Sequence, residues 1–186
     1  MTAERIPATQ LFTVTVYSEN SVGLLNRVSN IFTRRCLNIE DVSASMSSVP
    51  GINKLTLTTW SDRPTMEKVV GQLEKIVEVL RVFLFTDEDI VYQEIALYKV
   101  PTQALMEDKE LETVIRRHGA RVLDITPEYT VLEKTGHQWE TEALFDCLHR
   151  HGLRQFVRSG RVCVTRNPVE LIDIFLEKQK QRHDKA

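Results

Sequence analysis

The feature that most constrains the fold is an order of strand, helix, strand, strand, helix, strand that occurs twice along the chain. In the first half, two segments carry apolar residues at the 3.6-residue spacing of an amphipathic helix, and the segments around them have the pattern of strands. The second half repeats this order with little residue identity to the first. Two βαββαβ units predict an α+β protein with two ferredoxin-like sandwiches in tandem, each a sheet with its helices on one face.

A short acidic stretch divides the two units. Residues Thr86–Asp89 include no apolar side chain, so we place the domain boundary there. The predicted domains are 9–86 and 90–177, followed by a polar tail at 178–186. Close to the end of the second domain, two strand-like segments flank Ser159-Gly160, which predicts a hairpin turn.

Composition and charge exclude several classes of function. Lys and Arg total 24 and Asp and Glu total 26, so no overall positive charge favours nucleic acid. No apolar run approaches the ~20 residues that cross a bilayer, and the first ten residues lack the apolar core of a signal peptide. The three cysteines, Cys36, Cys147 and Cys163, are odd in number and widely spaced, which indicates a reducing compartment. We therefore expect a cytoplasmic protein.

No pattern in the sequence indicates catalysis or a metal centre. It contains no Gly-x-Ser-x-Gly, no His-Glu-x-x-His, no phosphate-binding loop and no dinucleotide-binding glycine motif. The strongest metal candidate is the pair His149 and His151, but residues two apart on a helix point to different sides. We predict neither a catalytic residue nor a metal ligand in this chain.

The stretch with the most functional content joins the first strand to the first helix. Asn20 and Gly23 precede a helix that begins at Leu24, and Asn38 follows the end of that helix. A helix start has unsatisfied backbone N–H groups and a positive dipole end, which suit a small anion such as a carboxylate. An asparagine amide both donates and accepts hydrogen bonds. Helix caps and turns use the same residue types, so the residues alone leave a ligand site and a simple cap equally open.

Several motifs, in order along the chain, resemble the regulatory (small) subunits of acetolactate synthase, which begin with an ACT domain. The opening of that domain is similar to ENSVGLLNRV at Glu19–Val28, followed by Asn38–Glu40. Further similar motifs are LEKIVEVLRV at Leu73–Val82, EIALYKV at Glu94–Val100, DITP at Asp124–Pro127 and RSG at Arg158–Gly160. The resemblance extends from about Leu11 to Arg166.

The resemblance implies a non-catalytic regulatory subunit in branched-chain amino-acid biosynthesis. Such subunits bind a catalytic subunit that uses thiamine diphosphate, magnesium and FAD to condense pyruvate with pyruvate or 2-oxobutyrate. They raise its activity and confer feedback inhibition by valine, or by leucine or isoleucine, and they dimerise through their ACT domains. The implied partners are thus the catalytic subunit, a second copy of this chain and the amino-acid effector, with no nucleic acid, no membrane and no cofactor on the chain itself.

In this family the effector binds at the interface between two ACT domains. Carried onto this sequence, Asn20 and Asn38 would bind its polar groups. Gly23, Leu24 and Leu25 would give backbone N–H groups to its carboxylate. Ile39 would help to form the pocket for its side chain.

One position departs from the family pattern, and one alternative function remains open. The family usually has glycine and an aromatic residue where this chain has Cys36 and Leu37. If position 36 is left-handed, a residue other than glycine costs roughly 1 kcal/mol there. The alternative is a stand-alone ACT-type sensor of an amino acid or a metal, without a catalytic partner. A transcriptional sensor would need a DNA-reading element, and the sequence shows no helix-turn-helix or basic arm.

Overall fold

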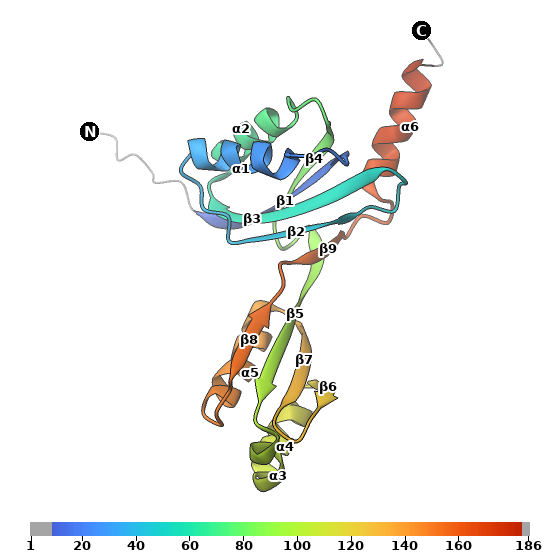
Figure 1. The fold of residues 1–186 in the computed structure, drawn as a ribbon. Coiled ribbons are helices and arrows are strands. Elements are labelled where there is room, and N and C mark those ends of the chain that lie inside the picture. Colours follow the sequence, from blue (N-terminus) through green and yellow to red (C-terminus); the bar gives the residue numbers. More distant parts are fainter. Residues whose placement is uncertain (1–8, 184–186) are drawn as a thin grey trace, which may run out of the picture. The chain divides into compact units, whose positions relative to one another are not determined.

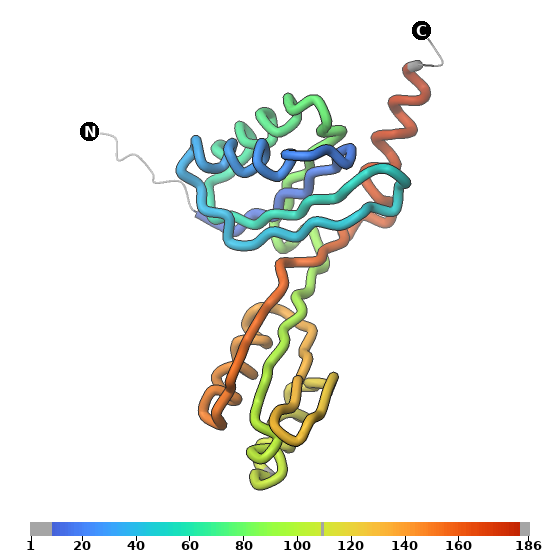
Figure 2. The backbone as a smooth tube through the Cα atoms, viewed as in Figure 1, coloured from blue at the N-terminus to red at the C-terminus, as the bar shows by residue number. Residues whose placement is uncertain are grey.

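The computed structural model describes residues 9–183 and divides the chain into two compact units, traced in Figure 1 and Figure 2. The first unit joins residues 9–91 to residues 163–183, and the second is Tyr92–Val162. Each unit is built on an antiparallel sheet with helices, which confirms the α+β class with two ferredoxin-like sandwiches. Among the described residues, no helix is long and apolar enough to span a membrane.

The first unit has a four-stranded sheet in the order β2-β3-β1-β4. All three strand pairs are antiparallel, and β1 pairs with β3 along its whole length, from Gln10 opposite Ser61 to Glu19 opposite Ile52. The elements follow the predicted order: β1 (Gln10–Glu19), α1 (Leu24–Arg34), β2 (Asp41–Met46), β3 (Ile52–Ser61), α2 (Arg63–Leu73) and β4 (Val79–Phe85).

Helices α1 and α2 lie on one face of the first sheet, as Figure 1 shows. Because side chains alternate across a strand, every second residue of β1 faces these helices. Phe12, Val14 and Val16 are fully buried in one core with Val28 of α1 and Met66 of α2. The periodicity of the sequence thus placed the core of this unit correctly.

The last part of the chain belongs to the first unit. It contains β9 (Val162–Thr165) and α6 (Leu171–His183). The Tyr17 hydroxyl on β1 donates to the Glu170 carboxylate at 3.0 Å, and the Arg81 guanidinium on β4 lies 5.7 Å from the centre of the Phe175 ring. The sequence pattern instead predicts that residues 90–177 form the second domain. The structure differs because Glu170, just before α6, and Phe175, within α6, contact side chains of β1 and β4.

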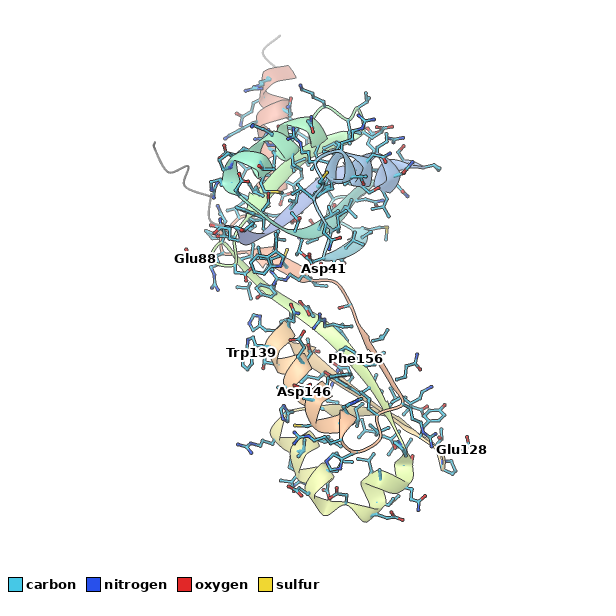
Figure 3. All side chains as sticks on the ribbon, turned by 90° about the vertical axis from the view of Figure 1, so that its left-hand side faces the viewer. Asp41, Glu88, Glu128, Trp139, Asp146 and Phe156 are labelled. Carbon is cyan, nitrogen blue, oxygen red and sulfur yellow. The ribbon has the colours of Figure 1, made fainter. Side chains whose placement is uncertain are left out.

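The second unit repeats the strand order of the first, with β6-β7-β5-β8 in its sheet. Figure 3 shows Phe156 of β8 beside α5, where its ring lies 5.2 Å from that of Tyr98 and 4.9 Å from that of Phe145. Tyr98 and Leu144 are fully buried in this second core. The elements are β5 (Ile90–Val100), α3 (Thr102–Glu107), α4 (Lys109–Arg117), β6 (Arg121–Ile125), β7 (Thr130–Gly136), α5 (Gln138–His149) and β8 (Gln155–Arg158).

The predicted hairpin at Ser159-Gly160 is wrong. In the described part of the chain β8 and β9 both pair with β5, and neither pairs with the other. The backbone N–H of Ser159 donates to the carbonyl of Ile95, and the Ser159 hydroxyl accepts from the N–H of Ile95. These bonds keep the chain running along β5. A Ser-Gly pair suits an irregularity in an edge strand as well as a turn, so the sequence pattern does not separate the two.

Candidate functional site

The start of α1 is open. Gly23 precedes the helix with φ 79° and ψ 4°, a left-handed conformation that favours glycine, and no side chain caps the helix. The N–H of Leu24 donates to the carbonyl of Ser21 at 3.3 Å. The N–H groups of Leu25 and Asn26 have no acceptor among residues 9–183. Two donors therefore remain available at the positive end of the helix, the arrangement that binds small anions.

A charged pair that the sequence analysis did not identify lies beside this helix start. Arg27 Nη2 is 2.7 Å from Glu78 Oε1 and 3.2 Å from Ser21 Oγ. A Cβ added to Gly23 would lie 3.6 Å from Arg27 Nη1, which is an ordinary contact distance. Within the chain, position 23 thus needs glycine because of its positive φ, whereas a Cβ there would not clash with any neighbour. The only signal for Arg27 in the sequence was its place one turn into the helix.

Asn20 lies at the same end of the sheet as the start of α1. It directly follows Glu19, the last residue of β1, whose N–H donates to the carbonyl of Glu78 at 2.9 Å. The Asn20 side chain is exposed, and its amide makes no hydrogen bond with any residue that the structure describes. Asn20, Gly23 and Leu25 therefore form one half of the predicted site, and we call this the Asn20 end.

Asn38 and Ile39 lie at the opposite end of the sheet. The Asn38 carbonyl accepts a hydrogen bond from Thr59 Oγ1 at 2.6 Å, and Thr59 pairs with Phe12 near the start of β1. Asn20 follows Glu19 at the far end of β1, and Glu19 lies seven residues beyond Phe12 in the register with β3. At ~3.3 Å per residue this is a separation of about 23 Å. One chain therefore does not bring the two asparagines together.

This second half of the predicted site, the Asn38 end, is partly occupied by contacts within the chain. Asn38 Nδ2 donates to Glu40 Oε1 at 3.0 Å. Ile39 is half-buried and packs against the core of the first unit. Ile39 therefore offers only part of its side chain to a ligand, whereas the Asn38 amide keeps its oxygen and one N–H for other partners.

The turn before Asn38 contains Cys36, which has a φ of 54° and is the one residue other than glycine with a positive φ in the described range. Position 36 is therefore left-handed, the case in which a residue other than glycine costs backbone energy. The N–H of Cys36 donates to the carbonyl of Thr33, and that of Leu37 to the carbonyl of Phe32, both at 3.0 Å. This is the Schellman pattern that usually has glycine at the left-handed position. Cys36 thus occupies a glycine-type turn, at a cost of roughly 1 kcal/mol.

The histidines have separate neighbours. The His149 ring stacks on Phe145 with 5.6 Å between ring centres, and His151 Nδ1 lies 3.1 Å from Asp108 Oδ2. Over the described part of the chain, no three His, Cys, Asp or Glu side chains are grouped so that they could hold a metal ion. The open groups at the two ends of the first sheet are therefore the strongest candidates for a functional site.

Two sequence families match the chain. The family described as the AHAS small subunit-like ACT domain matches residues 14–81, and the family described as the small subunit of acetolactate synthase matches residues 93–167. Together they cover most of both units.

Individual relatives agree with these matches. The acetolactate synthase small subunit of Mycobacterium bovis is 31% identical over 156 residues, which are 84% of this chain and 92% of that protein. A probable small subunit from Methanothermobacter thermautotrophicus is 28% identical, over 88% of this chain and 96% of that protein. The crystal structure of the small subunit from Thermotoga maritima aligns with a TM-score of 0.77 and 27% identity, over 86% of this chain and 99% of that one.

Proposed function

We propose, from the premise that this chain belongs to the family of acetolactate synthase small subunits, that the chain activates the catalytic subunit and makes that subunit sensitive to a branched-chain amino acid. Membership of the family carries the coarser part of this statement, a regulatory subunit that associates with a catalytic one. The proposal adds cytoplasmic location, activation, valine or a related effector, and a catalytic partner that carries thiamine diphosphate, magnesium and FAD.

The separation of the two half-sites is the observation that carries the proposal. Asn20 and Asn38 lie at opposite ends of β1, so a site that uses both requires two chains. A two-fold axis perpendicular to the strands exchanges the two ends of a sheet, and it can bring the Asn20 end of one copy to the Asn38 end of the other. The edge strands of this sheet, β2 and β4, are the places where two sheets can pair.

An apolar α-amino acid matches the groups that such an interface would contain. The free N–H groups of Leu25 and Asn26 suit its carboxylate. The amide oxygens of Asn20 in one copy and Asn38 in the other suit its ammonium group. The exposed part of Ile39 suits an aliphatic side chain, because apolar contact favours burial of both surfaces.

Regulation follows if the effector binds one arrangement of the dimer better than another. A ligand shifts a conformational equilibrium only by the difference in its affinity for the two states. An amino acid that contacts both copies stabilises the arrangement in which both half-sites reach it. The catalytic subunit would then respond to that arrangement through its own interface with this chain.

The test is acetolactate formation by the cognate catalytic subunit, with and without this chain, over a titration of valine, leucine and isoleucine. We expect the chain to raise activity and one of the amino acids to lower it again. Activation with no inhibition would support the proposed catalytic partner and contradict the proposed effector site. An unchanged rate in every condition would favour the stand-alone sensor.

A further inference from the structure

A cavity of about 190 Å³ lies on the face of the first sheet that α1 and α2 leave uncovered. All its lining residues belong to the first unit. Its floor comes from β1, β3 and β4, and its cover is the segment from Cys163 to Leu171. Part of this cover follows residue 167, where the match to the small-subunit family ends. The volume is more than ten times the ~15 Å³ that one water molecule needs.

The cavity has one cationic and one anionic side chain. Lys54 Nζ donates to the carbonyl of Cys163 at 2.9 Å, which uses one of its three donors. The two oxygens of Glu170 accept from the Tyr17 hydroxyl at 3.0 Å and from the Ser48 hydroxyl at 2.8 Å, and each keeps a further lone pair. Burial and the Glu170 carboxylate raise the pKa of Tyr17 above its ordinary value, so this phenol stays protonated as a donor. Lys54 and Glu170 both retain hydrogen-bonding capacity.

Thr15 places a further polar group on the floor of the cavity. Its side chain lines the cavity and is 1% exposed, and its hydroxyl has no hydrogen-bond partner among the described residues. A buried hydroxyl without a partner is costly, and native proteins nearly always satisfy such groups. An occupant of the cavity can satisfy this hydroxyl after the Thr15 side chain changes rotamer, because the oxygen itself has almost no accessible surface in the observed one.

The remaining walls are largely apolar, with Phe83 and Phe85 on the floor and Leu171 on the cover. The two charged side chains oppose each other in sign, so a simple anion or cation would meet one like charge. A zwitterion, which has one positive and one negative group and no net charge, would pair with both Lys54 and Glu170, and an apolar part would pack on the apolar walls. From this combination we propose that the cavity is a second ligand site, which takes a zwitterionic α-amino acid with an apolar side chain. This site does not depend on the effector site proposed at the start of α1.

In this site the ligand carboxylate pairs with Lys54 and accepts from Thr15, its ammonium group pairs with Glu170, and its side chain packs on the two phenylalanines. Such a ligand also joins the cover to the floor, because Glu170 lies just before α6 whereas Lys54 lies on β3. Binding should therefore stabilise the attachment of α6 to the first sheet.

The experiment is calorimetric titration of the full-length Gly23→Asp variant, in which the helix-start site is disabled, with L-valine, L-leucine, L-isoleucine, L-methionine and L-phenylalanine. We expect at least one to bind, and the matching amide and the matching carboxylic acid without an amino group to bind at least about ten-fold more weakly, because each lacks one charge. In the same background, Lys54→Met and Glu170→Gln should each weaken binding about ten-fold or more. Glu177→Gln, an exposed change on α6, is the matched control and should leave it unchanged.

Each result decides the matter. If none of the five amino acids binds the Gly23→Asp chain, or if Lys54→Met and Glu170→Gln bind as tightly as their parent, the cavity holds only water and the proposal is wrong. If binding survives in Gly23→Asp and depends on Lys54 and Glu170, the cavity site stands even where the catalytic subunit shows no feedback. Glu170→Gln keeps one oxygen that accepts from one of the two hydroxyls and gains an NH₂ group that donates to the other, so it removes the charge while both Tyr17 and Ser48 keep a partner.

Discussion

Helices α1 and α2 of the first unit begin in different ways, although each has 11 residues and both lie on the same face of one sheet. At the start of α2, the Asp62 carboxylate accepts from the N–H of Thr65 at 2.9 Å and from its hydroxyl at 2.8 Å. At the start of α1, Gly23 has no side chain to offer, and the N–H groups of Leu25 and Asn26 have no acceptor in residues 9–183.

The difference separates a helix start that serves stability from one that is available for binding. A cap such as Asp62 satisfies the donors of the first turn and stabilises the helix. A helix start without a cap leaves those donors to solvent or to a ligand, at the expense of that stabilisation. We therefore expect changes at Gly23 to alter regulation and changes at Asp62 to alter stability.

The largest expected effect comes from Gly23→Asp. An aspartate there adds bulk, requires an unfavourable φ and places a negative charge where the effector carboxylate should bind. We expect activation of the catalytic subunit to persist and inhibition by valine to disappear over the accessible concentration range. Gly71→Asp is the control, because Gly71 lies on α2 with open space around it. Full valine inhibition in the Gly23→Asp variant would contradict the proposed site.

A mixture of two variants tests whether the site needs two chains. Asn20→Ala and Asn38→Ala should each reduce valine inhibition strongly when assayed alone. In a dimer that contains one copy of each, one of the two sites keeps both asparagines. An equal mixture with random exchange therefore restores about a quarter of the sites, and partial inhibition should return. A mixture no more sensitive to valine than its components would contradict a site shared between two chains.

At the start of α2, Asp62→Ala should lower the melting temperature by about 3 °C, because it removes a capping acceptor. The midpoint of valine inhibition should not change. Asp62→Asn is the matched control, since asparagine caps helices about as well as aspartate. An altered valine midpoint in Asp62→Ala would remove the distinction between the two helix starts.

The contribution of the Asp62 cap should also depend on pH. The hydrogen bonds from Thr65 lower the pKa of Asp62 in the folded chain below its ordinary 3.8. A group with a lowered folded pKa stabilises the fold above its unfolded pKa and loses that contribution as the pH falls through the folded value. The difference in melting temperature between the parent chain and Asp62→Ala should thus be constant above about pH 5 and shrink below about pH 4. A difference that grows on acidification would contradict this.

The smallest effect concerns the other end of α1. Three helix ends share the same Schellman hydrogen bonds, and the left-handed residue is Gly119 after α4, Gly152 after α5 and Cys36 after α1. Cys36→Gly should raise the melting temperature by about 3 °C, because it relieves roughly 1 kcal/mol of backbone strain. Cys36→Ala keeps a Cβ and should give no such gain. If alanine stabilised as much as glycine, the thiol and not the backbone would be responsible.

Local patterns predicted much of the fold and part of the candidate site. The alternation of β1 and the apolar spacing of α1 located the buried faces, because those periods follow from backbone geometry alone. Gly23 and the start of α1 were found because a polar turn with glycine before an apolar stripe is a local signal. Arg27 and Glu78 were not found, because their contact joins residues 51 positions apart in the chain.

By itself, the sequence determined the order of the elements in the first unit, the two-domain α+β class and the family, whereas it did not predict α3 in the second unit. These depend on periods and turns within a few residues, which the backbone imposes locally. Only the tertiary structure decided that Asn20 and Asn38 lie at opposite ends of one sheet, that α6 packs on the first unit, and that β8 and β9 both pair with β5. Strand register and the docking of a distant segment depend on contacts between residues far apart in the chain, and no local pattern encodes those contacts.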